Sequence, residues 1–135
     1  MRAGTSGVGV LAAVAIASAL PASASAGIRG PCSATIKGRS VADLTLSTAD
    51  AIPVRLGSRV VVTMAAHQHM THYRITLTFA GATRTIKDKD ISSSSWADSV
   101  RVRQYAQLGR GFYVVRGEST GPGLSCSGEA LVHVT

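Results

Sequence analysis

The feature that most constrains the fold is a strict alternation of apolar and polar residues running from His72 to Phe79. Its apolar members are Tyr73, Ile75, Leu77 and Phe79, and the residues between them are Arg74, Thr76 and Thr78. Because successive side chains of a strand point to opposite faces, this pattern predicts a strand with one buried face. Gly81 and Ala82 favour a two-residue turn, after which residues 83–87 return as a second strand. A hairpin cannot bury its own apolar face, so the remaining chain must supply a second layer.

Further strand-like segments, separated by Gly, Ser, Pro and Asp, occupy most of the chain after residue 31. The clearest lie at 32–36, 52–56, 59–64, 96–104, 112–116 and 126–134, and a weaker one lies at 44–46. Pro53 favours an edge position for its strand. Residues 65–70 are expected to form a histidine-bearing loop, and residues 88–95 a polar connection. We therefore predict a single all-β domain, a β-sandwich of seven to eight strands.

The first 26 residues have the organisation of a secretory signal peptide. An apolar run at 8–20 is followed by small residues that include Ala24 and Ala26. We expect cleavage after Ala26, with cleavage after Ala24 as the alternative. The run of 13 residues is shorter than the roughly 20 that a membrane-spanning helix needs, and we expect no transmembrane segment after cleavage. The predicted units are a signal peptide at 1–26 and a β-sandwich domain at 27–135, which is secreted or held at the extracellular cell envelope.

The two cysteines of the chain, Cys32 and Cys126, lie on the first and last of the clearly predicted strands. Export would place them in an oxidising compartment, where a disulfide is the expected state. Such a bond typically contributes about 2 to 4 kcal/mol to stability. The alternatives are a redox pair or a metal-binding pair, but the short Cys-x-x-Cys spacing of such pairs is absent.

The run Gly111-Phe112-Tyr113-Val114-Val115-Arg116-Gly117 resembles the G-x-Y-x-V-x-G stretch of immunoglobulin-like and related bacterial surface domains. The resemblance implies that Tyr113 and Val115 point into the core. The Cys-Ser-Ala-Thr-Ile start, the Tyr-Arg-Ile-Thr-Leu-Thr-Phe-Ala-Gly hairpin and the Cys-Ser-Gly finish are similar to those of small secreted actinobacterial proteins without known activity. This second resemblance implies an immunoglobulin-like β-sandwich and an extracellular location, and it implies no chemistry.

Sequence patterns of catalysis are weak in this chain. The stretch Gly123-Leu124-Ser125-Cys126-Ser127-Gly128 resembles a nucleophile elbow, but its second glycine comes one position late and no helix pattern follows. Asp88, Asp90 and Asp98 have the charge of calcium ligands, but Lys89 separates the first two and the glycine of an EF-hand loop is missing. From these patterns we expect a protein that is not an enzyme.

The chain is basic, with a formal net charge of +7 at pH 7. Arg101 and Arg103 are two residues apart on one predicted strand, so their side chains point the same way. Arg74 and Arg84 are expected to share a face across the hairpin. These four arginines predict a non-catalytic binding or structural module that contacts an anionic cell-envelope polymer or a membrane surface. The alternative is that the charge only keeps the protein soluble. Nucleic acid is disfavoured by export and by the few aromatic residues.

The main alternative function rests on Met64, His67, His69, Met70 and His72, which fall within nine residues. Imidazole nitrogens bind Zn and Cu(II), and thioethers favour Cu(I). The grouping is similar to that of periplasmic copper carriers with immunoglobulin-like folds, although those have a histidine at the mature N-terminus, where Gly27 stands here. This pattern indicates an exported copper- or zinc-binding protein. The competing interpretation is a polar loop without metal, in which case no cofactor is expected.

Overall fold

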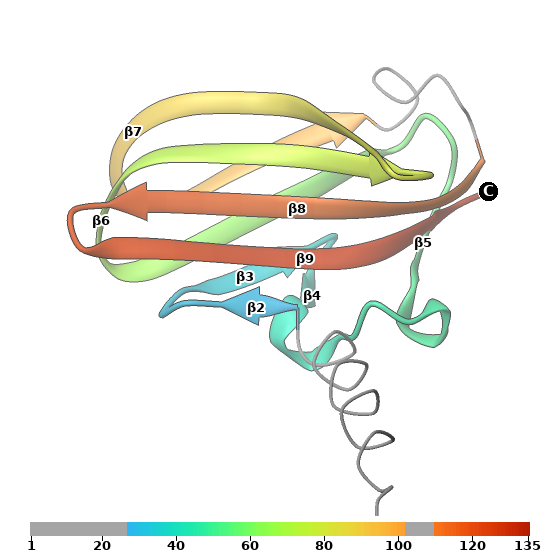
Figure 1. Cartoon of the computed structure of the whole chain (residues 1–135), viewed down its shortest axis with the longest axis horizontal. Helices are drawn as coiled ribbons and strands as arrows, with labels where there is room; N and C mark the ends of the chain where they lie inside the picture. Colours follow the sequence, from blue (N-terminus) through green and yellow to red (C-terminus); the bar gives the residue numbers. More distant parts are fainter. Residues whose placement is uncertain (1–26, 102–109) are drawn as a thin grey trace, which may run out of the picture.

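Eight strands form a single sheet that curls over itself into two layers in the computed structural model, which describes residues 27–101 and 110–135 (Figure 1). The strands are β2 (Ile28–Arg29), β3 (Ser33–Ile36), β4 (Arg39–Ser40), β5 (Ile52–Val54), β6 (Arg59–Phe79), β7 (Ala82–Arg101), β8 (Gly111–Gly121) and β9 (Leu124–Val134). The predicted signal peptide, and the end of the strand predicted at 96–104, lie outside the described residues. The all-β fold is confirmed.

The two longest strands, β6 and β7, each belong to both layers. In the first layer, residues 59–65 of β6 lie between β3 and residues 95–101 of β7. In the second layer, residues 72–78 of β6 lie between β8 and the N-terminal half of β7, and β9 continues the sheet beyond β8. Each strand thus crosses from one layer to the other, which gives an immunoglobulin-like sandwich with apolar side chains between the layers.

The predicted hairpin is present, but its turn lies one residue earlier than expected. Phe79 pairs with Ala82, so the two turn residues are Ala80 and Gly81. Their φ angles are 51° and 84°. A tight hairpin of this kind requires positive φ at both central positions, because only then does the turn match the twist of the strands. The first of these two positions is occupied by Ala80 and not by a glycine.

Two segments predicted to be irregular are instead strand, and this is a correction to the sequence-based interpretation. Residues 65–70 lie inside β6, and residues 88–95 lie inside β7. The pairing of β6 with β7 shifts register between Ala65 and Met70 and again between Met70 and His72. Such bulges bend a strand and interrupt its alternation. The sequence pattern therefore breaks at the place where β6 passes between the layers, although the strand continues.

The prediction of a weak strand at 44–46 is also wrong. Short 3-10 turns, η2 (Val41–Asp43) and η3 (Thr48–Asp50), flank that position instead. The oxygen Oδ2 of Asp50 accepts hydrogen bonds from the amide and the hydroxyl of Thr45. These local bonds compete with sheet pairing, which explains why two leucines did not make a strand. Pro53 does lie on an edge, because β5 pairs only with β9.

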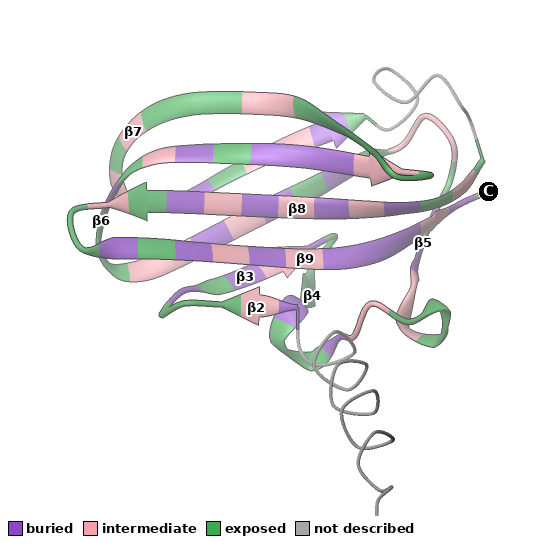
Figure 2. Cartoon of the chain, in the orientation of Figure 1, coloured by how far each residue is buried: buried purple, intermediate pink, exposed green. Residues whose placement is uncertain are grey.

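The core lies between the two layers, where buried and less buried residues alternate along β8 and β9 (Figure 2). Tyr113 and Val115 are both fully buried, as the resemblance to immunoglobulin-like domains implied. Other large side chains that are fully buried include Ile36, Ile52, Met64, Met70, Ile75, Val41, Val54, Val60, Val62 and Val100. No helix within residues 27–101 and 110–135 is long and apolar enough to cross a membrane.

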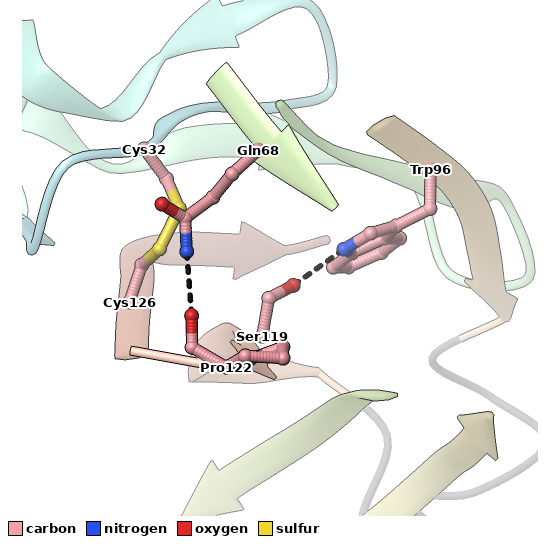
Figure 3. Close-up of a disulfide and its surroundings, with 6 residues drawn as sticks. All are labelled: Cys32, Gln68, Trp96, Ser119, Pro122 and Cys126. Carbon is pink, nitrogen blue, oxygen red and sulfur yellow. Dashed lines mark hydrogen bonds between the residues drawn. A yellow bond between two sulfur atoms is a disulfide. The ribbon is translucent and has the colours of Figure 1, made fainter. Parts of the chain in front are cut away.

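The predicted disulfide between Cys32 and Cys126 is confirmed (Figure 3). It joins the start of the first predicted strand, just before β3, to β9, and the Cα atoms of the two cysteines are 6.0 Å apart. Nearby, the Nε2 atom of Gln68 donates a hydrogen bond of 2.9 Å to the carbonyl of Pro122. Both bonds fasten the bend of β6 and the segment before β3 to the tip of the β8–β9 hairpin.

Candidate functional site

The outer face of the second layer is a continuous surface formed by β6, β8 and β9. Phe112, Val114, Arg116, Glu118 and Thr120 alternate with buried residues along β8, so they share this face. Their partners across the β8–β9 ladder are His133, Leu131, Glu129, Ser127 and Ser125. From Phe112 to Thr120 the face extends about 27 Å at the usual rise of a strand.

An aromatic pair lies at one end of this face. The rings of Phe112 and His133 are stacked, with centroids 4.2 Å apart and an angle of 9° between their planes. Phe112 is 40% exposed, and Val61 is the other large hydrophobic residue that is exposed in the described part of the chain. Val61 belongs to the first layer, opposite Ser99. Phe112 thus provides the outer face with its exposed aromatic surface.

An open depression of about 290 Å³ lies at the other end of the same face. Its lining residues are Arg29, Arg116, Glu118, Thr120, Ser125, Cys126 and Ser127. Arg29 reaches it from β2, because it pairs with Ser127 on β9. The depression therefore brings together two guanidinium groups, one carboxylate and three hydroxyl groups. Groups of these kinds can donate hydrogen bonds to polar ligands or accept them.

Ion pairs connect most of the charges on this face. The Nε atom of Arg116 lies 2.7 Å from Oε2 of Glu118, and its Nη1 atom lies 4.0 Å from Oε2 of Glu129. Arg74 lies 3.8 Å from Glu118 and 3.6 Å from Asp88. Arg74 and Arg116 are therefore largely neutralised by neighbouring carboxylates, although such half-exposed pairs contribute little to stability.

His72 lies between two aspartates of β7. Its Nδ1 atom is 2.8 Å from Oδ1 of Asp90, and its Nε2 atom contacts Oδ1 of Asp88. The hydrogen bond to Asp90 and the negative charge of Asp88 raise the pKa of His72 above its ordinary value, against a smaller opposing effect of desolvation. Because the carboxylates contact opposite edges of the ring, they cannot converge with it on one metal ion.

Asp98 on β7 accepts a hydrogen bond of 2.6 Å from the hydroxyl of Tyr73 on β6. Lys87 and Lys89 lie 3.8 and 3.6 Å from its carboxylate oxygens. Burial acts to raise the pKa of Asp98, but these bonds and charges outweigh it and lower the pKa. Burial, together with the bond to Asp98, raises the pKa of Tyr73 to about 12. The three side chains of Tyr73, Lys87 and Lys89 thus share Asp98 as their acidic partner.

The structure separates the five residues predicted to bind metal. Met64 and Met70 are buried in the core, where their sulfur atoms pack against apolar neighbours. His72 is held by Asp88 and Asp90. His67 and His69 are exposed on the bend of β6. His67, His69 and Met70 were expected in a loop at 65–70, but β6 continues through this segment, where Met70 is buried and the two histidines are exposed.

The four arginines predicted to form one basic patch do not gather either. Arg74 and Arg84 lie opposite Asp88 and Leu77 in the ladder, so they belong to opposite faces of the hairpin. Arg101 is exposed and lies opposite Arg59 on β6. Arg103 lies outside the described residues. Anion binding by these side chains stays a prediction, but a patch that contains both Arg74 and Arg84 is excluded by the register.

Phe112, His133 and Arg29 were missed as site residues by the sequence analysis. The inward positions of Tyr113 and Val115 already implied that Phe112 points outward. The partners of Phe112 and the depression depend on the β8–β9 and β2–β9 registers, which pair residues far apart in the sequence.

No protein-family model matches this chain, and no curated protein does. Solved structures do match. A polysaccharide monooxygenase of the CBM33 type has a TM-score of 0.50 at 10% identity, with 70% of this chain and 68% of that chain covered. CBM33 from Bacillus amyloliquefaciens, in complex with Cu(I), has a TM-score of 0.50 at 13% identity, with 73% and 65% covered. An LPMO from Kitasatospora papulosa has a TM-score of 0.48 at 11% identity. This chain spans about half the length of that LPMO, 51% of it.

These matches correct three predictions made from the sequence. We expected a non-catalytic module, a protein that is not an enzyme, and no cofactor, with copper or zinc only as an alternative. The predicted sandwich is present, but the solved structures that share its fold are described as a polysaccharide monooxygenase and as a CBM33 protein in complex with Cu(I). The likeness to a family of catalysts removes the basis for those expectations, which rested on missing sequence patterns. At 10 to 13% sequence identity, these matches show that the fold is similar, and they show nothing beyond the fold.

The residues of this chain do not form an evident copper centre. Among residues 27–101 and 110–135, no group of three or more His, Cys, Asp or Glu side chains is arranged to hold a metal ion. Gly27, the predicted mature N-terminus, is buried, and its nitrogen hydrogen-bonds to the carbonyls of Val41 and Leu44. A side chain at this position would collide with the carbonyl oxygen of Glu129, 2.1 Å from an added Cβ. The function proposed below therefore does not depend on copper.

Proposed function

We propose that this is an exported protein that binds polysaccharide on the outer face of β8 and β9. Export is supported by the signal-peptide pattern of residues 1–26. A polysaccharide partner is supported by the common fold with structures described as polysaccharide monooxygenases, and by the composition of the face itself.

The observation that carries the proposal is the exposed stack of Phe112 on His133. The C–H groups of a sugar ring are apolar and carry a slight positive charge, so they pack favourably on the negative face of an aromatic ring. An isolated exposed phenylalanine needs no explanation. Here the ring is fixed by stacking against a neighbour on a rigid ladder, which lowers the entropy lost when a ligand packs on it.

The rest of the face supplies what a sugar polymer needs beyond its apolar contacts. Hydroxyl groups and paired charges follow one another along β8 and β9, and these groups exchange hydrogen bonds with water for bonds with sugar hydroxyls. The face extends about 27 Å, which suits an extended polymer better than a single sugar. Several weak contacts along such a polymer act together and raise the overall affinity.

The test is co-sedimentation of the protein without residues 1–26 with a panel of insoluble polysaccharides, together with affinity electrophoresis in soluble ones. Phe112→Ala is expected to weaken binding about tenfold, the equivalent of roughly 1.4 kcal/mol. Val61→Ala, which removes the other exposed large hydrophobic side chain from the first layer, is the matched control and should bind like the unmodified protein. Equal affinities of the unmodified protein and Phe112→Ala across the panel would overturn the proposal.

A further inference from the structure

Arg29 differs from the other charged residues of the outer face in its surroundings. Arg74 and Arg116 lie beside Glu118, and each also faces a second carboxylate. Arg29 is exposed, and within the described chain no ion pair or hydrogen bond engages its side chain. It nevertheless lines the depression at the end of the face. The positive charge that remains uncompensated in the depression is therefore that of Arg29.

Hydroxyl groups surround this charge. Thr120, Ser125 and Ser127 line the same depression, and none of the three hydroxyls takes part in a hydrogen bond among the residues that the structure describes. The carboxylate of Glu118 accepts a bond from Arg116, so its negative charge is offset. The depression thus presents one free guanidinium group and three free hydroxyls, which can bind one carboxylate and several neighbouring sugar hydroxyls.

We infer that the depression is a subsite for an acidic sugar, such as a uronic acid residue, within the bound polysaccharide. This inference rests on the proposed function, because it assigns the second contact point on the same face. A planar carboxylate matches the fork of a guanidinium group and forms two parallel hydrogen bonds with it. The Phe112 stack holds the polymer at one end of the face, and Arg29 selects its charge at the other.

Binding of an acidic sugar in the depression depends on where Arg29 lies as well as on its positive charge. Arg59 is also exposed and carries the same charge, but it lies on β6 in the first layer, opposite Arg101. General attraction of a basic protein for an anionic polymer would depend on both arginines alike, and it would fade with salt for both. A built subsite depends on Arg29 alone, so the pair of substitutions Arg29→Gln and Arg59→Gln separates the two explanations.

The experiment compares binding to polygalacturonate with binding to the same backbone after methyl esterification, which removes the carboxylate charge and keeps the chain. The protein without residues 1–26 should prefer the charged polymer about tenfold, as expected for one charge-assisted contact. Arg29→Gln should abolish this preference and keep the binding to the ester, whereas Arg59→Gln should keep both. A preference that survives in Arg29→Gln, or is lost equally in Arg59→Gln, would overturn the subsite.

The same measurements distinguish failure of the subsite from failure of the proposed function. In one outcome, binding to the esterified polymer depends on Phe112, but Arg29→Gln does not change the preference for the charged polymer. That outcome overturns the subsite and leaves the polysaccharide face supported. Absence of Phe112-dependent binding to both polymers overturns the inference together with the face. Circular dichroism of each variant checks that the sandwich is intact.

Discussion

Tyr73 and Trp96 stack with ring centroids 4.1 Å apart and planes 11° from parallel, although they belong to different layers. Trp96 pairs with Met64 in the first layer, and Tyr73 pairs with Lys89 in the second. The polar end of each ring is bonded: Tyr73 donates to Asp98, and Nε1 of Trp96 donates to the hydroxyl of Ser119 at 2.6 Å. The stack therefore fixes how the two layers face each other, at the point where β6 and β7 cross between them.

Trp96→Phe tests the polar part of this contact. Phenylalanine keeps most of the stacking surface but removes Nε1, so the hydroxyl of Ser119, which is only 1% exposed, loses its donor. An unsatisfied buried polar group costs about 1 to 3 kcal/mol, and we expect a loss of this size in urea unfolding. Ser119→Ala in the same background should recover part of this loss, because it removes the unsatisfied hydroxyl. Additive losses would contradict the assigned bond.

The disulfide gives a second prediction. Cys126→Ala should lower the free energy of unfolding by about 2 to 4 kcal/mol, because the bond closes a loop with a sequence separation of 94 and restricts the unfolded chain. The exposed neighbour Ser125→Ala is the control and should change it by less than about 0.5 kcal/mol. Intact mass with and without reductant reports the bond directly. Two free thiols in protein recovered from an oxidising medium would rule it out.

Ala80 gives a third prediction, with the opposite sign. Its φ of 51° places an L-residue in the left-handed region, which costs roughly 1 to 2 kcal/mol relative to a right-handed conformation. Ala80→Gly should therefore raise stability, by about 0.5 to 1 kcal/mol once the greater flexibility of the unfolded glycine is included. Ala82→Gly, two residues later in β7, should lower it by a similar amount. A destabilised Ala80→Gly would contradict the turn.

The strands that sequence reasoning recognised are those whose two faces differ. Tyr73, Ile75 and Leu77 alternate with polar residues because one face of β6 packs on the core, so the period of two was visible. Residues 88–95 lack this contrast, because almost all of them are exposed along the outer strand of the sheet. Pairing with β6 holds them in strand conformation, and a pairing partner 14 or more residues away leaves no local trace in the sequence.

The candidate face illustrates the same limit. The direction of Phe112 followed from the inward positions of Tyr113 and Val115, so one residue of the site was within reach of the sequence. Its stacking on His133, and the meeting of Arg29 with the hydroxyls of β9, depend on register between distant segments. In contrast, the histidine and methionine cluster was conspicuous in sequence, but β6 places Met64 and Met70 in the core and His67 and His69 on the surface. Proximity along the chain was a poor guide to proximity in the fold.

His72 gives the last prediction, a pH dependence of stability. Both of its ring nitrogens face carboxylates, from Asp88 and Asp90, and the protonated ring can donate to both of them. Arg74 shares Asp88 and so competes for part of its charge. Because the pKa of His72 is raised above its ordinary 6.5, the contribution of His72 to the stability of the fold is fully present below that value. It is lost as pH rises through the higher pKa of the folded state.

The stability difference between the unmodified protein and His72→Gln should therefore be larger at about pH 5 than at about pH 9. His69→Gln, which removes an exposed imidazole without an ion pair among the described residues, is the control for the loss of an imidazole from β6. Urea unfolding measures both variants, and a His72→Gln difference that does not change with pH would show that the two aspartates do not bind the protonated ring.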